Sequence, residues 1–151
     1  MQIDPERDII VVLVSAWDAL YAIDPSAPAQ EITPLLSAGL KPVITPYAAI
    51  EYAPNLDQFV YYSANDGPHI YSITAPTGST WSQLTAGPWT WRSILSAGNC
   101  LDPIADAQAM SSYAVSRSHT FGRFRIATYG RTDVAILVRH SDTPVYVLRL
   151  S

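Results

Sequence analysis

Apolar residues in this chain fall into short runs that alternate with polar turns. The segment DVAILVRHSDTPVYVLRL, residues 133–150, shows the pattern clearly, because two apolar runs flank a polar stretch at residues 140–144. Runs of this kind, bounded by Pro, Gly, Asp or Ser, are typical of antiparallel strands. No segment shows the three- and four-residue spacing of an amphipathic helix. The pattern therefore predicts an all-β fold.

The chain also repeats itself. Residues 3–36 align with residues 51–85, and most matches keep one offset. The pairs at this offset are Pro5 with Pro54, Asp8 with Asp57, Ile10 with Phe59, and Leu35 with Leu84. Tyr21 and Ile23 meet Tyr71 and Ile73 after one extra residue in the intervening turn. A third copy, FRIATYGRTDVAILVRHSDTPVYVLRL, places Asp133 on Asp57 and residues 145–148 on residues 70–73.

Units of three or four antiparallel strands that recur about every 40–50 residues are typical of β-propeller blades. We predict one domain, residues 1–151, with three blades at about 1–36, 47–85 and 124–150 and a long insert at about 86–118. The first blade has a short inner strand at residues 1–3. The second has strands near 48–52, 59–63, 70–74 and 81–85. The third has three strands, and its fourth is missing.

The stretches PERDIIVVL, ALYAIDP and GRFR, followed by a hairpin that ends VYVLRL, resemble the closing blades of kelch-like, galactose-oxidase-type β-propellers. Kelch repeats carry a double glycine after the second strand, where this chain has Ser63-Ala64 and Val138-Arg139. Galactose oxidase and its relatives hold copper with a cysteine-linked tyrosine, a second tyrosine and two histidines. Cys100 lies in the insert, where no such motif is recognisable. We therefore carry over no copper site and predict no cofactor.

Composition limits the protein class. The 151 residues are 48% hydrophobic and 15% charged, which is typical of an ordered globular domain. A net charge of −4 gives no reason to expect binding to nucleic acid or to a membrane surface. The start MQIDPERD does not resemble a signal peptide, and no apolar run is long enough to cross a bilayer. The single cysteine fits a reducing compartment, so we predict a cytoplasmic location.

Charge is distributed unevenly along the chain. Residues 1–36 hold six acidic side chains and only Arg7 as a base, whereas residues 117–151 hold six arginines and two aspartates. Three blades form only an arc, and the chain closes on a strand whose edge is open to pairing. We therefore expect a homodimer, in which two copies join head to tail into a six-bladed ring.

Several side chains are candidates for a binding site. Glu51 and Arg125 fall on the innermost strands, which border the channel of a propeller, although an ion pair would explain them equally well. Trp89 and Trp91 share one face if that segment is extended. They would either stack on a sugar or protein partner or pack against the blades.

Other polar residues have simpler explanations. Asp18, Asp66 and Asp142 recur at equivalent turns, where they could line one face or cap their own backbone. His69, His119 and His140 have no spacing that suggests a metal site, so none is predicted. No phosphate-binding loop, nucleophile elbow or CxxC motif is present.

These features favour a non-catalytic β-propeller module that binds a ligand, such as a carbohydrate or a protein. The alternative is an enzyme whose site forms in the channel of the assembled propeller from groups such as Glu51, Arg125 and a histidine. A third possibility is that the chain is a fragment that acts within a longer propeller. A channel enzyme would bring several ionisable groups or a metal together, whereas a binding module would expose an aromatic groove.

Overall fold

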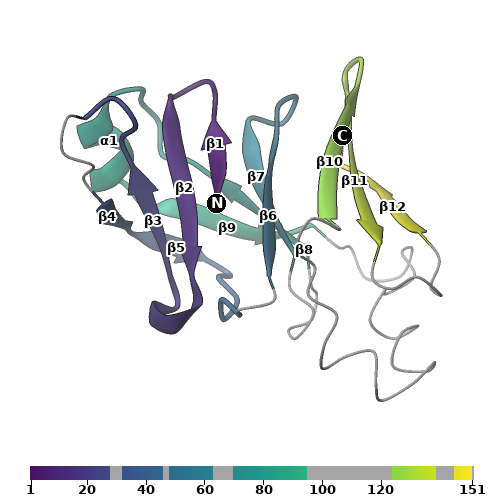
Figure 1. Cartoon of the computed structure of the whole chain (residues 1–151), viewed down its shortest axis with the longest axis horizontal. Coiled ribbons are helices and arrows are strands. Elements are labelled where there is room, and N and C mark those ends of the chain that lie inside the picture. Colours follow the sequence, from purple (N-terminus) through teal and green to yellow (C-terminus); the bar gives the residue numbers. More distant parts are fainter. Residues whose placement is uncertain (28–31, 46–47, 63–69, 95–123, 139–144, 151) are drawn as a thin grey trace.

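The computed structural model describes residues 1–27, 32–45, 48–62, 70–94, 124–138 and 145–150 (Figure 1). These residues form three β-sheets with one short α-helix and one 3-10 helix, which confirms the all-β prediction. In the described part of the chain, no helix is long and apolar enough to cross a lipid bilayer.

The first sheet is an antiparallel meander in the order β1-β2-β3-β4. Its strands are β1 (Gln2–Asp4), β2 (Ile9–Val14), β3 (Ala19–Ile23) and β4 (Ile32–Leu35). The 3-10 helix Ser15–Trp17 connects β2 to β3 and ends at Asp18, whose φ of 49° is in the left-handed region. These four strands fall within residues 1–36, and β1 is shifted by one residue from the short inner strand expected at residues 1–3.

The second sheet has the order β5-β9-β8-β7-β6. Its antiparallel strands are β6 (Ala49–Ala53), β7 (Gln58–Tyr62), β8 (Ile70–Thr74) and β9 (Trp89–Ser93). The three-residue strand β5 (Ser37–Gly39) adds to β9 in parallel, directly after β4 of the first sheet. The third sheet is the meander β10 (Phe124–Tyr129), β11 (Thr132–Val138) and β12 (Val145–Arg149).

One predicted strand is wrong. Residues 81–85 were expected to complete the second unit, but Trp81–Ala86 form the helix α1. Thr80 and Gln83 make a capping box, in which each side chain bonds to the other's backbone N–H. Such a box stabilises a helix start. The fourth strand is instead β9, inside the predicted insert at 86–118, and the remainder of that insert beyond residue 94 lies outside the described residues.

Two apolar cores lie between the three sheets. Between the first and second sheets, the core contains the largest buried rings, among them Phe59, Tyr61, Trp89 and Trp91. Between the second and third sheets, Val60, Tyr62 and Ile70 pack with Phe124 and Leu137. Neighbouring residues along β7 thus serve opposite cores, because side chains alternate across a strand. The second sheet is buried on both faces.

The innermost strands of the sheets lie next to one another. β6 contacts β1 of the first sheet on one side and β10 of the third sheet on the other. Figure 1 shows these three strands in sequence order across the molecule. The inner edges therefore converge, while the sheets extend away from them.

Aspartates at one repeat position connect the turns of neighbouring inner hairpins. Asp57 accepts two hydrogen bonds from the Arg7 guanidinium, at 2.6 and 2.5 Å, across the first two sheets. Arg7 also donates to buried Asp4 at 2.8 Å. The fully buried Asp133 accepts from the backbone N–H groups of Asn55 and of the next residue, at 2.7 and 3.2 Å. Each aspartate therefore accepts from the turn of the preceding sheet.

Both end sheets carry apolar side chains on the side turned away from the second sheet, here called their outer faces. Strand register puts Ile10, Val12, Tyr21, Ile23 and Ile32 together on the outer face of the first sheet. The third sheet likewise has Val134, Ile136, Val138, Val145 and Val147 on its outer face. All of these residues are partly or largely exposed, whereas the buried side chains of both end sheets lie on the inner faces.

Gly39 is the position where β5 approaches β9 most closely. Its φ is +82°, and a Cβ there would collide with the carbonyl oxygen of Trp91. Gly39→Ala should lower the free energy of unfolding by about 3 kcal/mol in urea denaturation, since strain and overlap add. Gly130→Ala is the matched control, because Gly130 has φ +61° and open space around it. The control substitution should lower the free energy of unfolding by about 1 kcal/mol. Equal losses would argue against close packing at β5.

Arg7→Met should lower the free energy of unfolding by about 2 kcal/mol at pH 7. The Arg7 hydrogen bond is the main cause that lowers the pKa of Asp57. A lowered carboxyl pKa adds stability above the unfolded-state value, near 4, and this stability is lost as the pH falls through the folded-state pKa. The difference between wild type and variant should therefore shrink below about pH 4. Urea titrations across pH measure it, with Arg92→Met as the control.

Candidate functional site

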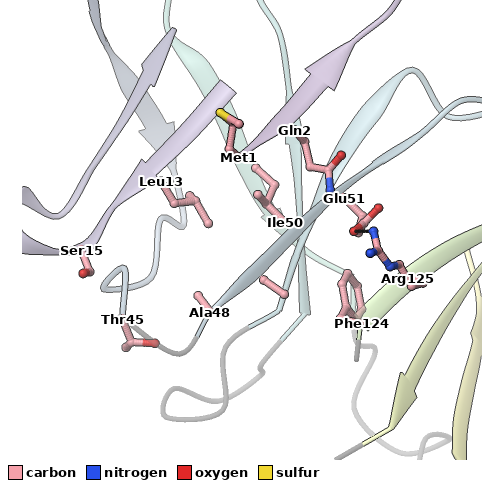
Figure 2. A pocket seen from close by; sticks show the side chains of 11 residues that line it. Met1, Gln2, Leu13, Ser15, Thr45, Ala48, Ile50, Glu51, Phe124 and Arg125 are labelled. Carbon is pink, nitrogen blue, oxygen red and sulfur yellow. Dashed lines mark hydrogen bonds and ion pairs between the residues drawn. The ribbon is translucent and has the colours of Figure 1, made fainter. Parts of the chain in front are cut away.

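A pocket of about 420 Å³ opens beside the innermost strands. Strands β1, β2, β6 and β10 line it, so residues from all three sheets meet there. Its polar lining comes from Gln2, Ser15, Thr45, Glu51 and Arg125, and its apolar lining from Met1, Leu13, Ala48, Ala49, Ile50 and Phe124. Figure 2 shows these side chains around the space between the first and third sheets.

Glu51 and Arg125 form the charged part of the pocket. Nη1 of Arg125 donates to Oε1 of Glu51 at 2.8 Å, which joins β6 of the second sheet to β10 of the third. Figure 2 shows the carboxylate and the guanidinium turned toward each other. The sequence placed both residues on innermost strands and gave an ion pair as one of two explanations. The structure brings them together as that ion pair.

The two partners differ in exposure. The Glu51 side chain is 15% exposed, whereas the Arg125 side chain is 62% exposed. Burial is the largest influence on Glu51 and raises its pKa above the usual range, while the charge of Arg125 and its hydrogen bond act in the opposite direction. The bond to Glu51 uses one of several N–H groups on the guanidinium. Arg125 can therefore donate to a ligand oxygen without breaking its ion pair.

The rest of the pocket suits a small, partly polar molecule. Phe124 is almost fully buried and stacks on Tyr62 with ring centroids 5.7 Å apart, which fixes the start of β10. This packing holds Arg125, the next residue, in place. The hydroxyl-bearing residues Ser15 and Thr45 lie on the opposite side, near Leu13. An apolar pocket with a few fixed polar groups is the usual form of a ligand site.

Trp89 and Trp91 do not contribute to this pocket. They share one face of β9, as their spacing predicted. That face is turned into the core between the first and second sheets, where the two side chains are 0% and 1% exposed. The indole of Trp89 donates to the Leu84 carbonyl at 2.9 Å, and that of Trp91 to the Ser37 hydroxyl at 3.3 Å. They are core residues here, and neither ring is open for stacking on a sugar.

Asp18 connects two segments instead of capping its own turn. Its Oδ1 accepts from the backbone N–H of Ile44 and from Nζ of Lys41, both at 2.7 Å. Burial by itself would raise the pKa of Asp18, but the hydrogen bonds from Ile44 and Lys41 outweigh it, so the pKa is lowered. Asp18 therefore holds the segment that leads into β6. The equivalent Asp66 and Asp142 lie outside the described residues.

Several other predicted positions also lie outside the described residues, namely His69, His119, His140 and Cys100. Among the residues that the structure describes, no group of three His, Cys, Asp or Glu side chains is arranged to hold a metal ion. The sequence did not point to Gln2, Ser15 or Thr45, because isolated polar residues beside a strand carry no recognisable pattern. Only the convergence of β1, β2 and β6 brings them to the pocket.

The pKa of Glu51 tests the ion pair directly. Arg125→Met should raise it further, because burial would then act without the opposing positive charge. Carbon-13 NMR titration of the Glu51 carboxyl group measures the value. Arg92→Met, on the distant strand β9, should leave it unchanged. An unchanged value in Arg125→Met would show that the two side chains do not interact in solution.

No protein-family model, curated protein or solved structure matches the chain.

Proposed function

We propose that this chain is a non-catalytic β-propeller module whose binding pocket lies beside the innermost strands, at Glu51 and Arg125. The three sheets are its blades, and a small carbohydrate or a carboxylate-bearing peptide is the class of ligand that fits the pocket. The cytoplasmic location expected from the single cysteine belongs to the same proposal.

The arrangement of the inner strands supports the propeller. β6 contacts β1 on one side and β10 on the other, and each of the three strands lies at one edge of its sheet. Propeller blades have this arrangement around a central channel. The bonds from Arg7 to Asp57 and from Asn55 to Asp133 repeat one connection between successive sheets. Repetition of a contact is expected when successive units are related by a similar rotation.

The pocket supports binding over catalysis. Its charged side chains, Glu51 and Arg125, already neutralise each other at 2.8 Å. Among the described residues that line the pocket, no other side chain is ionisable, so an acid–base reaction would have to use Glu51 without a second catalytic group. The exposed guanidinium is suited to donate a hydrogen bond to a carboxylate or sugar oxygen. This ion pair is the observation that carries the proposal.

Saturation-transfer NMR with a panel of neutral and acidic monosaccharides and short peptides tests it. We expect at least one class to bind and to remain chemically unchanged during long incubation. Arg125→Met should weaken that binding about tenfold, which is the effect of losing one charged hydrogen bond. Arg92→Met is the control, because Arg92 is an exposed arginine on β9, three strands from β6.

Two results would contradict the proposal. Conversion of a bound compound to a product would favour the alternative, an enzyme with its site in the propeller channel. Binding that Arg125→Met leaves intact would place the site elsewhere on the molecule.

A further inference from the structure

The outer faces of the two end sheets have the same character as the faces that already form the two cores. On the first sheet, Ile10, Tyr21 and Ile23 lie on the outer face. Their repeat equivalents in the second sheet are Phe59, Tyr71 and Ile73, which are 1%, 5% and 0% exposed. Those three residues pack against the first sheet. The repeat therefore predicts that the outer face of the first sheet packs against a preceding sheet.

The third sheet gives the complementary result. Ile136, Val138 and Val145 on its outer face are the equivalents of Val60, Tyr62 and Ile70. The latter three are 0%, 0% and 5% exposed because the third sheet covers them. By the same repeat, the outer face of the third sheet is built to be covered by a following sheet. One end of the arc thus needs a predecessor, and the other needs a successor.

Aspartates at one repeat position, that of Asp57 and Asp133, provide a polar contact between successive sheets in addition to the apolar packing. Asp57 and Asp133 each accept hydrogen bonds from the inner-hairpin turn of the preceding sheet. Asp8 is the equivalent residue in the first sheet, and its φ of 52° matches the 50° of Asp57. Asp8 is exposed, at the edge where a preceding sheet would place its turn. The inner-hairpin turn of the third sheet carries Arg131, which is also exposed.

We propose that a second copy of this chain covers both faces. The outer face of β10–β12 in one copy packs on the outer face of β1–β4 in the other, and Arg131 of each copy binds Asp8 of its partner. The inference rests on the proposed propeller, because it requires the blades to be related by a rotation.

Two observations favour a second copy over a different protein. The first unit is strongly acidic and the last third of the chain is rich in arginine, so the two ends attract each other and repel their own kind. The blade number is also suitable. Propellers typically have about 4–8 blades, and two copies of the three sheets described here would give six. Two copies related by a twofold axis then close without a free face.

Sedimentation velocity of the full chain at micromolar concentration tests the proposal. We expect a species of twice the 16.5 kDa chain mass. Asp8→Arg should raise the dissociation constant by on the order of 100-fold, because two like charges then meet across the contact. The double variant Asp8→Arg with Arg131→Asp should restore most of the affinity. Arg92→Asp, which changes charge elsewhere, should leave the dimer intact.

The apolar faces are tested separately. Ile10→Glu and Val147→Glu each put a charge on one outer face and should both produce monomers. Circular dichroism and thermal melting identify any variant that fails to fold, and the restored double variant controls for folding of Asp8→Arg.

A wild-type monomer would overturn the proposal, as would an open polymer whose mass rises with concentration, or a dimer that both face variants leave intact. Ligand binding that depends on Arg125 is measured in the same samples. A monomer that still binds would refute the dimer while leaving the proposed module in place.

Discussion

Burial of both faces of the second sheet is the constraint on which the described structure depends. Along β7, Phe59 and Tyr61 enter one core while Val60 and Tyr62 enter the other. A sheet with apolar side chains on both faces cannot remain exposed to water, so it requires a layer on each side. The first and third sheets provide those layers. Without them, the rings of Trp89 and Trp91 would also lose their cover.

The polar contacts between the sheets determine how those layers are aligned. Apolar packing is non-directional and would tolerate some sliding of one sheet over the next. Arg7 donates two hydrogen bonds to Asp57, and Asp133 accepts hydrogen bonds from two consecutive backbone N–H groups of the neighbouring turn. Both arrangements demand particular positions and directions. The aspartates thus fix the inner edges, and the pocket at Glu51 and Arg125 forms where these edges meet.

Much of the fold was predictable because alternation and repetition act on the same residues. The strands predicted near 48–52, 59–63 and 70–74 correspond to β6, β7 and β8 within one residue. The helix α1 was missed because it is short and only Leu84 is buried in it, with Trp81 packed against the core beside it. The sequence signal for this helix was the capping box formed by Thr80 and Gln83, which is a local motif and leaves no alternation of apolar and polar residues. Because residues 81–85 were predicted to be the fourth strand, β9 fell in the predicted insert, and stacking on a partner and packing against the blades both stayed open for its tryptophans. The sequence placed Glu51 and Arg125 on inner strands and left a channel site and an ion pair as equal explanations, whereas the rest of the pocket depends on how three sheets converge.

The small strand β5 has consequences for the order of folding. Only Leu36 separates it from β4, yet it pairs with β9, and its flanking bonds run from Trp89 to Leu36 and from Leu40 to Trp91. This pairing closes a loop of about 50 residues that contains the rest of the second sheet, and loop closure on this scale is slow compared with hairpin formation. Once formed, it ties the outer edge of the second sheet to the chain that leaves the first. The two sheets should therefore open together as one cooperative unit, while the third sheet, held by packing and turn contacts, is free to open separately.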